Sequence, residues 1–204
     1  MTAKFAAALG LGLILGWSGP AAAAGNKDAG QAKSSTCMAC HGADGNSANP
    51  EWPSIAGQPA SYIVKQLKHF KAAERNNPLM MPMAMPLSEQ DMEDLAAWFT
   101  AQAPRPTGET EPGKLKLGER LYRGGDASRS LPACAGCHGP AGAGIAGAFY
   151  PRIGGQHATY AAAQLRAYKS GGRATDPNGM MRTVAGKLSE EEIDAVASYL
   201  QGLR

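Results

Sequence analysis

The chain has few of the residues that characterise several common protein classes. It contains only four cysteines and four phenylalanines in 204 residues, and aromatic side chains make up 6% of the total. The formal net charge is +3, without the clustered lysines and arginines of a nucleic-acid-binding surface. Beyond the N-terminal run Phe5–Trp17, no apolar stretch approaches the roughly 20 residues that a membrane-spanning helix needs. We therefore expect no nucleic-acid partner and no later membrane span.

Residues 1–24 have the arrangement of a secretory signal peptide. Lys4 provides a positive start, the apolar run follows, and Ala22-Ala23-Ala24 offers small residues for cleavage. An uncleaved anchor helix is the alternative. We expect cleavage near Ala24 and a mature protein that resides outside the cytoplasm, in the periplasm.

The rest of the sequence is an internal duplication. The stretch SIAGQPASYIVKQLKHFK at 54–71 matches RIGGQHATYAAAQLRAYK at 152–169 with a constant offset of 98 residues. A second pair, PLSEQDMEDLAAWF at 86–99 and KLSEEEIDAVASYL at 187–200, matches with an offset of 101. Ordered matches of this kind indicate two copies of one domain.

A stretch rich in proline and glycine separates the two copies. Residues 105–113 read RPTGETEPG, which favours a linker over a helix or a strand. The expected domains are therefore 25–104 and 114–204. Domains of fewer than about 100 residues bury small cores and usually need a bound group or a crosslink for stability.

The hydrophobic periodicity is helical in both copies. Ile63, Leu67 and Phe70 follow the i, i+4, i+7 spacing of one helix face. Ser88 and Ser189, each followed by acidic residues, occupy the position of a helix N-cap. No segment alternates with period two for long enough to predict a strand. The predicted fold is all-α, with two tandem domains of three or four helices each.

All four cysteines lie in two Cys-x-x-Cys-His motifs, one in each copy. The motifs comprise Cys37, Cys40 and His41 in the first copy and Cys134, Cys137 and His138 in the second. A zinc site would need both pairs close together, and a thioredoxin-like redox motif would need a βαβ setting. A disulfide is compatible with export but leaves the histidine without a role.

Covalent attachment of haem accounts for every residue of these motifs. The two thiols form thioethers with the porphyrin and the adjacent imidazole binds the iron, as in c-type haem attachment. We expect two haem c groups, with His41 and His138 as axial ligands. Pro53 and Pro151 lie between the motif and the next helix, where a carbonyl oxygen could accept the Nδ1 hydrogen of the histidine. Ordinary packing of the loop is the alternative role for these prolines.

A methionine is the expected sixth ligand of each iron. The first copy has the methionine-rich stretch PLMMPMAMPLS at 78–88, and the second has NGMMRTVAGKLS at 178–189. When the two Leu-Ser pairs before the last helices are aligned, Met80 faces Met181, and no other column is methionine in both copies. A methionine ligand occupies the sixth coordination position of the iron and raises the reduction potential of the haem. Both effects are typical of an electron carrier and not of an enzyme.

The sequence after residue 24 resembles the dihaem cytochromes c4. The resemblance covers both Cys-x-x-Cys-His motifs, the IAGQ and IGGQ stretches, the paired helices containing Gln-Leu, both axial methionines and the C-terminal SYLQGL. It implies two class I cytochrome c domains packed about a pseudo-twofold axis. It also implies a periplasmic carrier that exchanges electrons with a respiratory complex and a terminal oxidase, and that associates peripherally with the membrane.

Two alternative functions share these motifs. A dihaem cytochrome subunit of a larger oxidoreductase, such as a sulfide-oxidising flavocytochrome, would differ in its interface and not in its haem chemistry. A dihaem peroxidase would need one accessible iron, and the symmetric methionine column argues against it.

Overall fold

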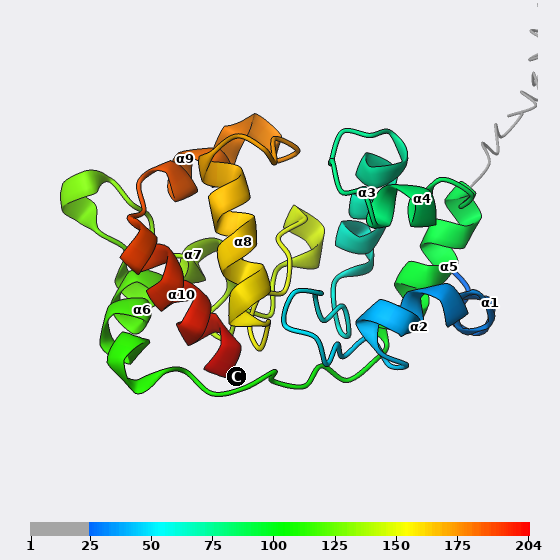
Figure 1. The fold of residues 1–204 in the computed structure, drawn as a ribbon, viewed down its shortest axis with the longest axis horizontal. Helices are drawn as coiled ribbons and strands as arrows, with labels where there is room; N and C mark the ends of the chain where they lie inside the picture. Colours follow the sequence, from blue (N-terminus) through cyan, green and yellow to red (C-terminus); the bar gives the residue numbers. More distant parts are fainter. Residues whose placement is uncertain (1–24) are drawn as a thin grey trace, which may run out of the picture.

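The computed structural model describes residues 25–204, which form two helical lobes side by side (Figure 1). The helices of the first lobe are α1 (Lys27–Lys33), α2 (Ser35–His41), α3 (Ala60–Lys71), α4 (Met80–Ala84) and α5 (Glu89–Thr100). The expected signal peptide falls on residues 1–24, which lie outside the described residues. No helix of the described part is long and apolar enough to cross a membrane.

The second lobe repeats this order of helices. Its helices are α6 (Pro112–Gly124), α7 (Ala135–His138), α8 (Ala158–Lys169), α9 (Met180–Gly186) and α10 (Glu190–Gly202), with short 3-10 turns η1 (Ala127–Arg129), η2 (Ala146–Ala148) and η3 (Pro177–Gly179). Within residues 25–204 the only β-type pairings are two isolated bridges. The all-α expectation is confirmed.

Each lobe has five α-helices, more than the three or four that periodicity predicts. The additional helices are short: α4 has five residues and α7 has four. A helix of one turn contains too few residues to show a hydrophobic period, so the sequence pattern misses it.

The last helix of each lobe begins as expected. The hydroxyl of Ser88 accepts a hydrogen bond from the backbone N–H of Asp91, whose side chain in turn binds the Ser88 backbone. Ser189 and Glu192 form the same reciprocal capping box in α10. Both satisfy backbone donors that would otherwise lack partners at a helix start.

The first and last helices of each lobe cross at a glycine. A Cβ atom placed on Gly30 of α1 would lie 2.0 Å from the carbonyl oxygen of Asp94 in α5. A Cβ on Gly118 of α6 would lie 2.3 Å from the carbonyl oxygen of Ala195 in α10. Only glycine allows the two backbones to approach this closely.

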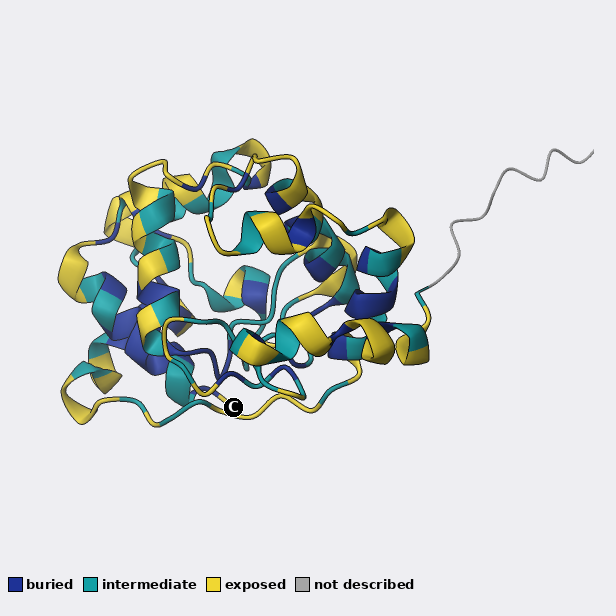
Figure 2. Cartoon of the chain, turned by 45° about the vertical axis from the view of Figure 1, so that its right-hand side comes forward, coloured by how far each residue is buried: buried dark blue, intermediate teal, exposed yellow. Residues whose placement is uncertain are grey.

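The buried apolar residues form one cluster in each lobe (Figure 2). In the second lobe the cluster joins α6, α8 and α10 and contains the fully buried pair Leu121 and Tyr122. The cluster of the first lobe is smaller: its buried members are Ile63, Leu95, Ala96 and Phe99.

The connection between the lobes runs along one edge of the molecule (Figure 1). Helix α5 ends at Thr100 and α6 begins at Pro112, inside the segment 105–113 that composition assigns to the linker. Proline is well placed there, because the first helical residue needs no backbone N–H bond. The backbone N–H of Arg105 donates to Asn46 and that of Thr107 to Gly155, so the connection is bonded to both lobes.

The lobes meet through two reciprocal glutamines. Gln58 binds the backbone of Arg152 through both atoms of its amide, accepting from N at 2.7 Å and donating to O at 3.1 Å. Gln156 binds the backbone of Ser54 in the same way, at 3.0 and 2.9 Å. Gln58 and Gln156 are equivalent in the duplication, as are Ser54 and Arg152, so the interface has pseudo-twofold symmetry.

Replacing Gly118 with alanine should destabilise the second lobe. The new methyl group would overlap the α10 backbone, and overpacking of this kind costs about 1–3 kcal/mol. We expect a lower thermal unfolding midpoint. Gly113→Ala in the same helix is the control, since its Cβ would meet nothing within 4 Å. Equal midpoints for the two variants would contradict the close crossing.

Asp94 should make the stability of the first lobe depend on acid pH. Hydrogen bonds from Lys33, the Asn26 backbone and Gln90 lower the pKa of this buried carboxyl to about 2. Because the folded-state pKa lies below the unfolded value of about 3.9, the contribution is complete above that value and is lost as the pH falls toward 2.

Denaturation of the wild type and of Asp94→Asn at several pH values measures this contribution. The variant should unfold more easily at pH 7 and should lose less stability between pH 4 and pH 2. Parallel pH profiles for the two proteins would show that Asp94 contributes nothing.

Candidate haem-binding sites

Each Cys-x-x-Cys-His motif forms a short helix that ends at its histidine. His41 is the last residue of α2 and His138 is the last residue of α7. The following residues, Gly42 and Gly139, both have a φ of +80°, which lets the chain turn sharply away from the helix. A Cβ at Gly42 would also lie 2.3 Å from the carbonyl oxygen of Asn46.

The two histidines make the expected hydrogen bonds to proline carbonyl groups. His41 Nδ1 lies 2.8 Å from the carbonyl oxygen of Pro53, and His138 Nδ1 lies 3.0 Å from that of Pro151. A carbonyl oxygen can only accept, so Nδ1 carries the hydrogen and Nε2 keeps its lone pair. The bond therefore fixes both the tautomer and the orientation of the ring, as groups behind a metal ligand do.

Burial keeps both imidazoles neutral. His41 and His138 are 8% and 7% exposed. Burial lowers the pKa of each ring, and the bond to the proline carbonyl only partly opposes this effect. A neutral imidazole with a free Nε2 lone pair is the form that binds a metal ion.

The four cysteines are half-buried, and none of them forms a disulfide. Burial raises the pKa of Cys37, and it raises that of Cys134 to about 11. Within residues 25–204 no three His, Cys, Asp or Glu side chains gather as a metal site, so the two pairs do not combine as a zinc site would require. The donor set in each lobe is therefore two thiols and one oriented imidazole, which fits a covalently attached haem.

The axial methionine candidates lie in short helices, and a polar side chain from the preceding segment accepts a backbone hydrogen bond from the first turn of each. Met80 is the first residue of α4, and its backbone N–H donates to Asn77 Oδ1 at 2.9 Å. Met181 lies in α9, where buried Asp176 accepts from the backbone N–H and the Nε of Arg182 at 3.0 and 2.8 Å. Both methionines are half-buried.

The other methionines of the first lobe differ in exposure. Met81 is half-buried like Met80, but Met83 and Met85 are 49% and 55% exposed. The side chains of Met83 and Met85 therefore face solvent, which leaves Met80 and Met81 as the half-buried methionines of the stretch 78–88.

Several residues that support these sites were not identified from the sequence. Tyr122 is fully buried, and its hydroxyl donates to the carbonyl oxygen of Gly139 at 2.5 Å, next to His138. Ser47 donates from its hydroxyl to the carbonyl oxygen of Cys40. Such contacts depend on side chains meeting across the fold, and no motif or periodicity signals them.

The two histidines outside the motifs do not join these sites. His157, the N-cap residue of α8, is buried between the lobes, and its Nε2 lies 2.8 Å from the carbonyl oxygen of Ser47. His69 lies in α3 with a side chain that is 17% exposed, and it is 3.7 Å from Glu74. Neither residue belongs to a Cys-x-x-Cys-His motif.

Comparison with known proteins agrees with this geometry. The sequence model of the cytochrome c family matches twice, at residues 23–101 and 116–204. Cytochrome c4 of Thiocapsa roseopersicina is 51% identical over 181 residues, which cover 88% of this chain and 93% of that protein. Cytochrome c4 of Pseudomonas aeruginosa is 46% identical over 192 residues, covering 94% and 95%.

A solved structure shows the same arrangement of two domains. Reduced recombinant cytochrome c4 from Pseudomonas stutzeri superimposes with a TM-score of 0.86 at 44% identity, covering 89% of this chain and all of that one. Each lobe therefore has the cytochrome c fold, and the tandem pair defines a dihaem c-type cytochrome. The chain belongs to the cytochrome c4 family.

Membership of this family establishes the class of activity. The protein is an electron carrier and not an enzyme, so the peroxidase alternative is excluded. Two cytochrome c domains, each with a Cys-x-x-Cys pair, carry two covalently bound haem c groups.

Tyr122→Phe tests the support behind the second motif. The substitution leaves the carbonyl oxygen of Gly139 without its donor, and loss of one such bond lowers the free energy of unfolding by about 1 kcal/mol. Denaturant unfolding of the haem-loaded protein would measure the loss. An unchanged unfolding midpoint would show that this bond does not stabilise the site.

Proposed function

We propose that each lobe holds its haem through two thioethers and two axial ligands. The attachment residues are Cys37 and Cys40 in the first lobe and Cys134 and Cys137 in the second. The axial pairs are His41 with Met80 and His138 with Met181. The observation that carries this assignment is the repeated bond from histidine Nδ1 to a proline carbonyl, which leaves Nε2 as the ligand atom in both lobes.

These residues suit transfer of single electrons. When bound, haem supplies the one-electron couple of ferric and ferrous iron. A neutral imidazole and a thioether add no charge to the iron, and thioether sulfur favours the ferrous state, so the pair raises the potential. With His41 and Met80, or His138 and Met181, bound to the iron, each lobe would exclude small molecules from it and would change oxidation state with little rearrangement.

The choice of Met80 in the first lobe rests on register and exposure. Met80 is half-buried and aligns with Met181, whereas Met83 and Met85 point to solvent. Met81 aligns with Arg182, which is bonded to Asp176 and cannot be a ligand.

We further propose that the carrier works in the periplasm and passes electrons toward a terminal oxidase. The signal-peptide pattern of residues 1–24 supports export, and resemblance to the cytochromes c4 supports the oxidase as acceptor and a respiratory complex as donor. Peripheral membrane association follows from the same resemblance. Reoxidation of the reduced protein by oxidase-containing membranes, and its failure in membranes whose oxidase is inhibited, tests the acceptor.

A visible spectrum with and without carbon monoxide tests the closed coordination. The dithionite-reduced protein should contain two haems per chain, and carbon monoxide should leave its spectrum unchanged. A spectrum that changes for one haem would identify an open iron and refute axial methionine in that lobe.

Met181→Ala should open the second iron alone. We expect the variant to keep both covalent haems and to bind carbon monoxide at one of them, because alanine offers no ligand atom. Met180→Ala is the control, since its position aligns with Leu79 in the first lobe. A six-coordinate spectrum for Met181→Ala, or carbon monoxide binding by Met180→Ala, would contradict the alignment of the two copies that assigns Met181 as the ligand.

A stable partner would distinguish a subunit from a diffusible carrier. A flavin-containing protein that remains bound through gel filtration would identify this chain as the cytochrome subunit of a larger oxidoreductase. Elution as a single chain with full haem content supports the carrier.

A further inference from the structure

The peptide group that binds the motif histidine of the first lobe also binds the second lobe. This group joins Pro53 to Ser54. Its carbonyl oxygen lies 2.8 Å from His41 Nδ1, and its N–H donates to Gln156 Oε1 at 3.0 Å. The histidine of one lobe and a glutamine of the other are therefore hydrogen-bonded to the two ends of a single peptide group.

The second lobe contains the same arrangement. The carbonyl oxygen of Pro151 lies 3.0 Å from His138 Nδ1. The N–H of the same peptide group, which belongs to Arg152, donates to Gln58 Oε1 at 2.7 Å. Each lobe thus supplies a glutamine to the histidine site of the other. We call the path from a histidine through its peptide group to the glutamine of the other lobe a crossed relay.

The geometry of the peptide group fixes the direction of every bond in a relay. A trans peptide directs its C=O and its N–H to opposite sides, and residues 25–204 contain no cis peptide bond. A backbone N–H only donates, so each glutamine presents its amide oxygen to it. The amide nitrogen then donates to the carbonyl oxygen of the same residue, at 2.9 Å for Ser54 and 3.1 Å for Arg152.

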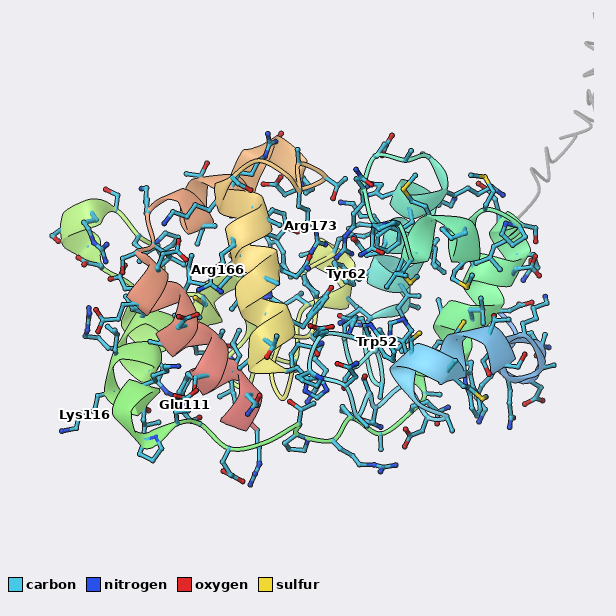
Figure 3. The ribbon with its side chains drawn as sticks, viewed as in Figure 1. Trp52, Tyr62, Glu111, Lys116, Arg166 and Arg173 are labelled. Carbon is cyan, nitrogen blue, oxygen red and sulfur yellow. The ribbon has the colours of Figure 1, made fainter. Side chains whose placement is uncertain are left out.

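The relays lie where the two lobes face each other. Figure 3 shows Trp52, the residue before Pro53, in the part of the first lobe that faces the second. Gln58 and Gln156 are buried, so water competes little for their hydrogen bonds. Both histidines are also buried, as described above. Each relay is therefore a hydrogen-bonded path inside the protein.

A relay couples its two ends because a peptide group is polarisable. Resonance gives the C–N bond partial double-bond character, so a hydrogen bond donated by the N–H moves negative charge onto the carbonyl oxygen. Hydrogen bonds in such a chain strengthen one another by about 10–30% each. The glutamine thereby makes the proline carbonyl a stronger acceptor for the Nδ1 hydrogen.

A stronger bond at Nδ1 changes the imidazole at its other nitrogen. An acceptor behind a ligand histidine raises the basicity of the ligand atom. A more basic Nε2 stabilises ferric iron more than ferrous iron, because the ferric form carries one more positive charge. An intact relay therefore lowers the reduction potential of the haem that its histidine binds.

We propose that Gln156 tunes the reduction potential of the haem in the first lobe, and that Gln58 tunes that of the haem in the second. Each glutamine is a positioning residue, since it acts only through the peptide group and the histidine of the other lobe. The proposal rests on the proposed axial ligation by His41 and His138 and extends it across the interface between the lobes.

Gln156→Met and Gln58→Met test the two relays. Methionine is similar in length to glutamine but has no amide, so the proline carbonyl loses its polarisation. Redox titration of haem-loaded Gln156→Met, with the two haems resolved by NMR, should show a raised potential for the first haem and an unchanged potential for the second. Gln58→Met should raise the potential of the second haem alone. In each variant the affected haem belongs to the lobe without the substitution.

The ring proton of each histidine gives a second readout. In NMR spectra of the fully reduced, diamagnetic protein, the Nδ1 proton of His41 should move upfield in Gln156→Met, because its hydrogen bond is weaker. The Nδ1 proton of His138 should keep its position in that variant. Gln156→Asn, whose amide is one methylene shorter and loses its reach to Ser54, should give the same shifts and replaces Gln156→Met if the methionine variant does not fold.

Ser61→Ala is the matched control for a loosened interface. The hydroxyl of Ser61 donates to the carbonyl oxygen of Ala146 in the other lobe at 3.1 Å, and neither residue belongs to a relay. This variant loses one bond between the lobes but keeps both polarised peptide groups. Both potentials and both Nδ1 proton signals should therefore stay at their wild-type values.

Three results would overturn the crossed relays. The potential could shift only for the haem of the substituted lobe, it could shift equally for both haems, or it could stay unchanged for both. The last result would show that the glutamines only join the lobes. Failure of the axial ligation appears separately, as carbon monoxide binding by the reduced wild type, so the two failures give different results.

Discussion

The hydrogen bond from histidine Nδ1 to a proline carbonyl is the interaction on which both functional sites depend. It commits one ring nitrogen to the protein and leaves the other as a lone-pair donor, while burial keeps the ring neutral. Gly42 and Gly139 turn the chain at the end of each motif helix, and the carbonyl oxygen of Pro53 or Pro151 further along lies within hydrogen-bond distance of Nδ1. The end of a short helix, a glycine with positive φ and a proline carbonyl thus leave one imidazole nitrogen free to bind a metal ion in each lobe.

The sequence predicts the parts of this arrangement that repeat. The duplication predicts two similar domains, the Cys-x-x-Cys-His motifs predict the candidate haem sites, and Ser88 and Ser189 predict the starts of the last helices. The proline carbonyl bond could be predicted because Pro53 and Pro151 occupy matching places after the motifs. Each of these features occupies a short stretch of sequence and occurs in both copies, so its presence in one copy supports the interpretation of the other.

The remaining features could not be predicted, because they depend on contacts between distant segments. Nothing near Tyr122 in the sequence indicates that its hydroxyl meets the carbonyl of Gly139. Between the lobes, Arg75 and Arg173 both donate to Gln66 and to Gln164. These residues are equivalent in the duplication, so the repeat shows that they correspond but not that they are in contact. The helices α4 and α7 are too short to show a hydrophobic period in the sequence, so they are identified only in the structure.

The reciprocal glutamines have a consequence for how the two lobes differ. Residue i of one lobe binds residue j of the other and j binds i, which is the pattern of an isologous dimer. In a homodimer every substitution would appear on both sides of the axis. Fusion of the copies removes this restriction, so His157 faces the first lobe where its counterpart Pro59 offers no side-chain hydrogen bond. A single chain can thereby keep the geometry of a symmetric dimer while the residues around its two candidate haem sites become different.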